Sequence, residues 1–338
     1  MRSHVTIDLG ALRRNVQTLV RILGGAELWA VVKGDGYGHG AVDCAGAALA
    51  GGATALCVAT VGEAVELRTA LPDARVLVLG PSRGADLALA REARLELVAG
   101  RGEIPLDVPV HMKLDTGMGR WGLSELAAPG SNVVGVMTHL ATADLDLDFA
   151  RIQVERFRAA TEQWSHLTRH AANSAAALRL PESRFDAVRC GIAIYGLSPF
   201  GTDAAADVLE PVLGWTSEIA QARLLRAGGS TGYGRRFVAA RDTWVGIVPV
   251  GYADGFRRSL SGTDLLVGEE RCKVVGTVSM DALAVELPGE RTAGTPVTIV
   301  GRALPLEAHA AHAGTITYEL ACGINSSPAR ASRTVIGA

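Results

Sequence analysis

The chain has 338 residues, of which 48% are hydrophobic and 20% are charged, and its formal net charge is −2. This length accommodates two domains with sizeable cores. A net charge so close to zero gives no electrostatic reason to expect nucleic acid or an anionic membrane surface as a partner. No apolar run reaches the ~18 residues of a membrane-spanning helix, and the N-terminal segment lacks the apolar core of a signal peptide, so we expect a cytoplasmic protein with no membrane partner.

Short apolar runs alternate with Ala-, Leu- and Arg-rich stretches over the first two thirds of the chain. Several runs lack hydrophobic alternation, as strands do when both of their faces are buried. The candidate strands are Leu28–Val32, Ala55–Ala59, Val76–Leu79, Leu95–Val98, Val110–Leu114, Val133–Met137, Arg169–Ala172 and Ala187–Ile194. The expected helices are Leu9–Leu23, Ala41–Ala50, Gly62–Ala70, Gly84–Glu92, Leu147–Trp164 and Ala175–Leu180.

Eight strands with helices between them predict an α/β domain built as a (β/α)₈ barrel of the TIM type. A doubly wound open sheet would show a similar pattern, so the repeat alone leaves that alternative open. The fifth repeat is the weakest, because Gly100–Pro109 is too short and too rich in proline to predict a good helix.

The sequence changes character near residue 210, after which β-branched residues, glycines and turn signals dominate. A helical pattern returns at Leu306–Ala313. We therefore predict two domains, a barrel over residues 1–210 and a mostly β domain over residues 211–338. The strands expected in the second domain include Trp244–Val248, Cys272–Val275, Ala282–Val285 and Val297–Val300.

Five scattered cysteines form no Cys-x-x-Cys pair, so we expect no metal site and buried, reduced thiols. The most informative segment is Ala30-Val-Val-Lys-Gly-Asp-Gly-Tyr-Gly-His-Gly40, in which an apolar strand leads into Lys33 and four glycines follow. Polar residues at the C-terminal ends of barrel strands face the active site. A partly desolvated lysine there has a lowered pKa and can act as an amine nucleophile.

This segment resembles the pyridoxal-phosphate attachment signature of the alanine racemases. Six further segments resemble motifs of that family in the same order: Lys113–Arg120, Thr138–Asp144, His170–Ser174, Val188–Gly196, Val250–Gly255 and Val278–Asp281. Seven motifs in one order identify the chain as a member of this family of isomerases. The resemblance implies a pyridoxal-phosphate enzyme that interconverts L-alanine and D-alanine and supplies D-alanine for peptidoglycan.

Racemisation needs two bases on opposite faces of the substrate and an electron sink. The resemblance implies that Lys33 holds the cofactor as a Schiff base and is one base, and that Tyr252 is the other. It also implies that Arg189 faces the pyridine nitrogen and keeps it unprotonated, since arginine does not release its proton. His139, a further implied cofactor residue, and Arg189 are expected to supply the positive charge that a tyrosinate needs.

The resemblance implies a substrate-carboxylate site formed by Arg120 and the backbone around Met280. Lys113 matches a lysine that is carbamylated in some members, although an ordinary charged lysine is the default. In the family, the residues matched by Tyr252 and Met280 come from a partner subunit, so the implied state is a homodimer. The remaining implied cofactor residues are Tyr37, Asn173, Ser174 and the backbone amides of Gly191 and Ile192.

The match fails near the C-terminus, where Ser326 stands at the position of a family tyrosine that helps to hold the phosphate and narrows the entrance. We therefore expect a roomier pocket mouth and some activity on serine, and a broader, serine-preferring racemase stays an alternative. Gly62 also stands where many relatives have an acidic residue in a network around His170, the residue expected to orient Arg189. His111 is expected to be structural.

Three other functions are less consistent with these residues. A decarboxylase of this fold usually places a carboxylate at the pyridine nitrogen, which Arg189 argues against. A non-catalytic pyridoxal-phosphate carrier is a barrel alone and would leave the second domain without a purpose. A structural scaffold would not need Lys33, Arg120, Arg189 and Tyr252 together.

Overall fold

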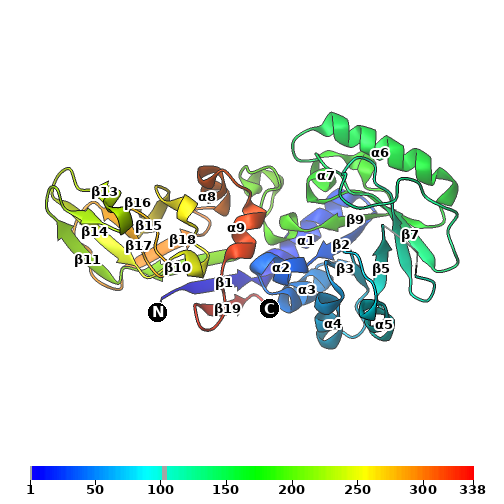
Figure 1. Ribbon diagram of the computed structural model, residues 1–338, viewed down its shortest axis with the longest axis horizontal. Helices are drawn as coiled ribbons and strands as arrows, with labels where there is room; N and C mark the ends of the chain where they lie inside the picture. Colours follow the sequence, from blue (N-terminus) through cyan, green and yellow to red (C-terminus); the bar gives the residue numbers. More distant parts are fainter. Residues whose placement is uncertain (1, 101–104) are drawn as a thin grey trace. The chain divides into compact units, whose positions relative to one another are not determined.

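The computed structural model of the protein describes residues 2–100 and 105–338. They form two compact units (Figure 1). One unit spans Gly10–Glu210, and the other combines the first nine residues with Pro211–Ala338. The prediction of a barrel over residues 1–210 differs from this division at the N-terminus, because residues 2–9 belong to the C-terminal unit.

The first unit is a closed barrel of eight parallel strands. Its strands follow the chain in order around the barrel, and the first pairs with the last, which rules out the open-sheet alternative. Strands such as β3 and β9 are buried at every position, which explains their lack of hydrophobic alternation. The strands are β2 (Glu27–Val31), β3 (Ala55–Val58), β4 (Val76–Val78), β5 (Glu96–Ala99), β6 (Val110–Lys113), β7 (Val133–Met137), β8 (Thr168–His170) and β9 (Ala187–Cys190).

The helices of this unit lie close to their expected positions, with one addition directly after β2. Local capping sets several starts: Thr60 and Glu63 form a capping box on one helix, and the Asp146 side chain caps another. No helix occurs in the described part of residues 100–109. The helices are α1 (Leu9–Leu23), α2 (Lys33–Gly38), α3 (Ala41–Ala50), α4 (Val61–Ala70), α5 (Ala85–Glu92), α6 (Leu147–Thr161) and α7 (Ser174–Arg179), with 3-10 helices η1 (Glu162–Trp164), η2 (Pro181–Ser183), η3 (Ile192–Tyr195) and η4 (Ala204–Asp207).

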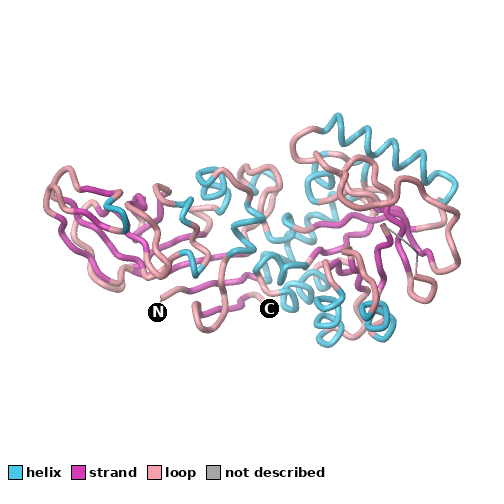
Figure 2. The backbone as a smooth tube through the Cα atoms, viewed as in Figure 1, coloured by secondary structure: helices cyan, strands magenta, loops and turns pink. Residues whose placement is uncertain are grey.

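The second unit is mostly β, as predicted (Figure 2). It contains a nine-stranded sheet in the order β11-β14-β17-β16-β15-β18-β10-β1-β19. Its strands are β1 (His4–Asp8), β10 (Leu213–Glu218), β11 (Gln221–Leu225), β14 (Thr243–Val248), β15 (Asp264–Val267), β16 (Glu270–Val275), β17 (Leu283–Leu287), β18 (Pro296–Val300) and β19 (Ser332–Ile336), with a separate pair β12 (Ser230–Thr231) and β13 (Phe237–Val238). Its helices are α8 (Leu306–Ala313) and α9 (Thr317–Gly323), with 3-10 helices η5 (Tyr233–Arg235), η6 (Tyr252–Asp254) and η7 (Arg258–Leu260).

Strand β1 belongs to this sheet because it pairs antiparallel with β10 and parallel with β19. Val5 and Ile7 alternate with less buried neighbours and are completely buried, so one face of β1 contributes to the core of the C-terminal unit. None of the helices in the described ranges is long and apolar enough to cross a membrane.

Candidate active site

The family-matched residues of the barrel lie at or just beyond the C-terminal ends of its strands. Lys33 follows β2, Lys113 ends β6, His139 follows β7, Ser174 follows β8 and Arg189 lies in β9. Because all eight strands are parallel in a closed barrel, these strand ends meet at one face. The topology therefore brings together side chains that are up to 156 residues apart in sequence.

The backbone immediately after Lys33 forms a left-handed turn. Gly34, Asp35, Gly36 and Tyr37 have φ angles of 62°, 50°, 61° and 55°. Glycine adopts this conformation freely, but Asp35 and Tyr37 are strained there, and strain of this kind is concentrated at functional sites. This turn was not predicted from the sequence. It buries Tyr37, which lies four residues after the lysine.

Lys33 is exposed in the single chain. Its position is nevertheless defined, since the amide of Gly34 donates a 2.7 Å hydrogen bond to Glu63.

Several hydrogen-bonding groups surround Gly191. Its amide donates to the Ser174 hydroxyl at 3.0 Å, and a Cβ at this position would collide with the Tyr37 hydroxyl. Ile192 begins η3, whose first amides have no intrahelical acceptor. Tyr37, Ser174 and the backbone at residues 191–192 thus form a compact cradle that suits a phosphate group.

Asn173 lies beside this cradle and caps helix α7. Its side-chain oxygen accepts a 3.0 Å hydrogen bond from the amide of Ala176. By capping the helix, Asn173 positions Ser174, which is the first residue of the helix.

Arg189 is a buried cation held by neutral partners. Its guanidinium donates to the backbone oxygens of Thr138, His170 and Ala171 at 2.9–3.1 Å and to Nδ1 of His170 at 2.7 Å. Burial lowers the pKa of Arg189 to about 10, so the side chain is still protonated near neutral pH. Among the described residues, no carboxylate contacts it.

A chain of buried side chains leads from Arg189 through the barrel interior. Nε2 of His170 lies 2.9 Å from Nδ1 of His111, whose Nε2 lies 2.8 Å from Glu96. Arg75 binds both oxygens of Glu96 at 2.7 and 3.0 Å. We call the four side chains from Glu96 through His111 and His170 to Arg189 the barrel relay.

The two ends of the barrel relay fix the direction of every hydrogen bond in it. Arg189 can only donate, so Nδ1 of His170 accepts and its Nε2 carries the proton. Nδ1 of His111 then accepts, and its Nε2 donates to the carboxylate of Glu96. Both histidines are therefore neutral and in defined tautomers.

The pKa directions agree with this arrangement. Burial lowers the pKa of His170 well below its usual range, and burial also lowers the pKa of His111 despite the hydrogen bond to Glu96. For Glu96, burial alone would raise the pKa, but hydrogen bonds from His111 and Arg75 lower it to about 2. The place of His111 in the barrel relay was not predicted. A histidine inside an apolar barrel strand was the sequence feature that could have indicated it. Gly62 takes no part in the network.

His139 is also neutral. Burial lowers its pKa well below the usual range, and the positive charges of Arg189, Lys113 and Lys33 lower it further. The expectation that His139 supplies positive charge was therefore wrong, because burial, reinforced by neighbouring cations, disfavours its protonation.

Lys113 and Arg120 share an aromatic partner. Nζ of Lys113 lies 5.3 Å and the guanidinium carbon of Arg120 lies 4.6 Å from the ring centroid of Trp121. Burial, followed by the charges of Arg189 and Arg120, lowers the pKa of Lys113 to about 8. Arg120 itself is exposed, which leaves its guanidinium accessible to a carboxylate.

The matched residues of the C-terminal unit lie on two loops that are joined through their backbones. The amide of Tyr252 donates to Ser279, and that of Ala253 donates to Met280, both at 3.0 Å. Tyr252 and Met280 are 43% and 52% exposed, so this rigid pair of loops presents both residues at the surface.

A second exposed tyrosine, Tyr233, lies next to the same loops and was not considered in the sequence analysis. It is 75% exposed and stands between Gly232 and Gly234, both with positive φ. The hydroxyl of Thr277 donates to its backbone oxygen at 3.2 Å. The Gly-Tyr-Gly sequence was the signal that could have identified it.

A barrel whose strand ends carry a lysine, a phosphate cradle and a buried arginine, combined with a mostly β unit, defines a class of two-unit barrel enzymes. The family description "Alanine racemase, N-terminal domain" matches residues 7–199, and "Alanine racemase, C-terminal domain" matches residues 212–332. The chain belongs to the alanine racemase family.

Individual relatives agree over nearly the full length. The chain is 39% identical to the alanine racemase of Levilactobacillus brevis, with 96% of each protein covered, and 40% identical to that of Symbiobacterium thermophilum, with 94% of each covered. The crystal structure of the alanine racemase from Streptomyces coelicolor is similar with a TM-score of 0.91 at 35% identity, covering 100% of this chain and 98% of that one.

The pKa of Glu96 predicts how stability depends on pH. Glu96 titrates at about 2 in the folded protein, against a reference value of 4.5, so its contribution is present above pH 4.5 and is lost as pH falls. Between pH 6 and pH 3, the advantage of the wild type over Glu96→Gln should shrink by about 2 kcal/mol. Urea unfolding at both pH values measures this, and an advantage that does not change with pH would contradict the assigned ion pair.

Proposed function

We propose that this protein is an isomerase that interconverts L-alanine and D-alanine with pyridoxal 5′-phosphate bound at the barrel mouth. The observation that carries the proposal is the grouping of Lys33, Arg189 and the cradle around Gly191 on adjoining strand ends. An amine, a cationic ring partner and a phosphate cradle match the three recognisable parts of this cofactor. The relatives along nearly the whole chain are named for this reaction.

The bound cofactor supplies the electron sink that makes the α-proton of an amino acid acidic. Lys33 would hold the cofactor covalently and would move the proton on one face of the substrate. Arg189 would hold the pyridine nitrogen of the cofactor and leave it unprotonated, because a guanidinium with a pKa of about 10 retains its own proton at neutral pH. Arg120 and the backbone at Met280 bind the substrate carboxylate.

An exposed tyrosine of the C-terminal unit moves the proton on the other face. The resemblance assigns this base to Tyr252, whose loop is tied to that of Met280. Tyr233 is a second candidate, favoured by its greater exposure and by its turn between two glycines.

Two alternatives lose support. A decarboxylase would place a carboxylate beside the pyridine nitrogen, but the residue at that implied position is the buried cation Arg189. The relatives named above are alanine racemases, which gives no support to a serine-preferring enzyme. Ser326 is partly buried in the C-terminal segment.

The assembly we propose is a homodimer in which Tyr252 and Met280 of each chain complete the site of its partner. Their exposure of 43% and 52% is the supporting observation, since residues that bind substrate are normally enclosed. We also propose that the product D-alanine serves peptidoglycan synthesis in the cytoplasm. No disulfide joins the cysteines of the described residues, as is usual in a reducing compartment.

Incubation with L-alanine in deuterated water tests the proposed reaction. The wild type should lose optical rotation and incorporate α-deuterium, and Lys33→Ala should lower both rates at least ~100-fold because one proton-transfer group is removed. Lys273→Ala, which changes an exposed lysine paired with Asp264, is the matched control and should retain full activity. A wild type that releases carbon dioxide, or leaves alanine unchanged, would refute the proposal.

Paired tyrosine variants identify the second base. Tyr252→Phe should lower the exchange of one enantiomer at least ~100-fold while the other continues to exchange through Lys33. Tyr233→Phe is the matched control. If Tyr233→Phe shows this one-sided loss and Tyr252→Phe does not, the base is Tyr233.

Light scattering during size-exclusion chromatography tests the assembly. The expected mass is twice that of the 35.2 kDa chain. A mass of 35.2 kDa for fully active enzyme would refute completion of the site by a partner.

A further inference from the structure

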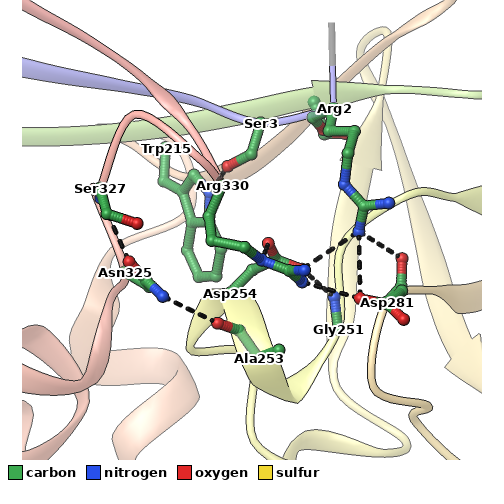
Figure 3. A network of polar contacts seen from close by, with 11 residues as sticks. Arg2, Ser3, Trp215, Gly251, Ala253, Asp254, Asp281, Asn325, Ser327 and Arg330 are labelled. Carbon is green, nitrogen blue, oxygen red and sulfur yellow. Dashed lines mark hydrogen bonds and ion pairs between the residues drawn. The ribbon is translucent and has the colours of Figure 1, made fainter.

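A carboxylate is buried beneath the exposed loop that carries Tyr252. Asp254 is 1% exposed and has a separate partner for each oxygen. One oxygen accepts a 2.8 Å hydrogen bond from the amide of Gly251, and the other accepts from Nε of Arg330 at 2.8 Å (Figure 3). Asp254 therefore ties the start of its own loop to a residue 76 positions further along the chain.

Arg330 connects that loop to a second one. While Nε binds Asp254, a terminal nitrogen of the same guanidinium donates to Asp281 at 2.9 Å (Figure 3). Asp281 directly follows Met280 in sequence, and Arg2 donates to its backbone oxygen at 2.9 Å. The planar guanidinium of Arg330 thus bridges the two carboxylates, a geometry that lysine cannot reproduce. Arg2 also lies within ion-pair distance of both, 3.6 Å from Asp254 and 3.7 Å from Asp281.

The backbone leaves the two loops little freedom. The amide hydrogen bonds from residues 252 and 253 to residues 279 and 280 join them in register. A Cβ on Gly251 would collide with the carbonyl oxygens of Ser279 and Met280, so only glycine allows this approach. Asn325 adds a third connection, because its side chain donates to the oxygen of Ala253 at 3.1 Å.

Stability alone does not account for this arrangement. A buried ion pair commonly adds little to the free energy of unfolding compared with apolar residues of the same volume, because desolvating the charges is costly. Its distinctive contribution is geometric, since a planar guanidinium that donates to two carboxylates fixes their separation and orientation. Here the fixed geometry is transmitted to Tyr252 and Met280, two exposed residues of the loops.

We propose that Asp254, Arg330 and Asp281 form a clamp of positioning residues that holds Met280 and Tyr252 in the geometry needed to receive the substrate. This inference rests on the proposed racemase function and deepens it. The clamp acts through the backbone at residues 252–253 and 279–281, and none of its three side chains needs to contact the substrate. Its loss should mainly weaken substrate binding, because the substrate-carboxylate site at Met280 is displaced while Lys33 is unchanged.

Asp281→Ala is the most informative variant. Asp281 is about half exposed, so the substitution removes one arm of the clamp without opening the core. The KM for alanine should rise at least ~5-fold, since small displacements of binding groups are costly, while kcat changes less and the thermal midpoint changes little. Asp281→Asn retains an oxygen that accepts from Arg330 and should restore most of the wild-type KM.

A second pair of variants separates positioning from stability. Arg330→Met leaves Asp254 buried without its main partner and should lower both the thermal midpoint and substrate affinity. Adding Asp254→Asn removes the buried charge, so the double variant should regain thermal stability. The KM should stay raised, because the connection to Asp281 is still missing.

Arg226→Met is the matched control. It breaks another arginine–aspartate pair of the same unit, with Asp242, that touches neither loop, and should leave KM unchanged. The clamp is refuted if Asp281→Ala keeps a wild-type KM, or if KM simply follows thermal stability across the variants. A wild type without racemase activity refutes the proposed function instead, and this inference with it.

Discussion

The pairing of strand β2 with strand β9 is the constraint on which the site depends. It closes the barrel and places Trp29 opposite Arg189 and Ala30 opposite Cys190. This register sets the buried arginine beside the strand that delivers Lys33. The lysine emerges from a fixed strand end, and the left-handed turn after it directs Tyr37 toward Gly191. The amine and the phosphate cradle are therefore located by one closed sheet.

Arg189 has an unusual electrostatic environment for a buried cation. Its hydrogen-bond partners are backbone oxygens and a neutral histidine, and the nearest carboxylate of the barrel relay, Glu96, is two histidines away. The hydrogen bonds of the relay run from Arg189, which donates, through the two neutral histidines to Glu96, which accepts. A guanidinium that is held in this way keeps its proton and its orientation together. Both properties suit the role that we propose for Arg189, which is to donate a hydrogen bond to the ring nitrogen of the cofactor and leave it unprotonated.

Much of this architecture could be predicted from local patterns. The barrel strands were recognisable as short apolar runs, and helices α1 and α3 occur at their expected bounds. Contacts between distant segments were not predictable. Strand β1 joins the C-terminal sheet by pairing with β10 and β19. These partners lie more than 200 residues further along the chain, so no local pattern indicates the pairing. The strained turn at Asp35 and Tyr37 could not be predicted for a different reason. Positive φ is uncommon for both residue types, so their presence does not indicate such a turn.

In the candidate site, too, local motifs could be predicted and contacts between distant segments could not. Lys33 and Arg189 stand in recognisable motifs, whereas the partners of Arg189 come from β8 and from the segments that follow β7 and β8, and only the closed barrel brings them together. Likewise, Asp254 was visible in a motif but its partner Arg330 was not. His139 was recognised as a site residue with the wrong charge, because its neutral state depends first on burial in the folded barrel and then on cations from other segments.

Covalent attachment at Lys33 is the central claim, and borohydride trapping tests it most directly. The purified protein is saturated with pyridoxal phosphate, reduced with borohydride and digested, and the peptides are analysed by mass spectrometry. The account predicts that the reduced cofactor is found on the peptide that contains Lys33, with loss of the visible imine absorbance. Labelling of Lys113 or another lysine, with Lys33 unmodified, would contradict it.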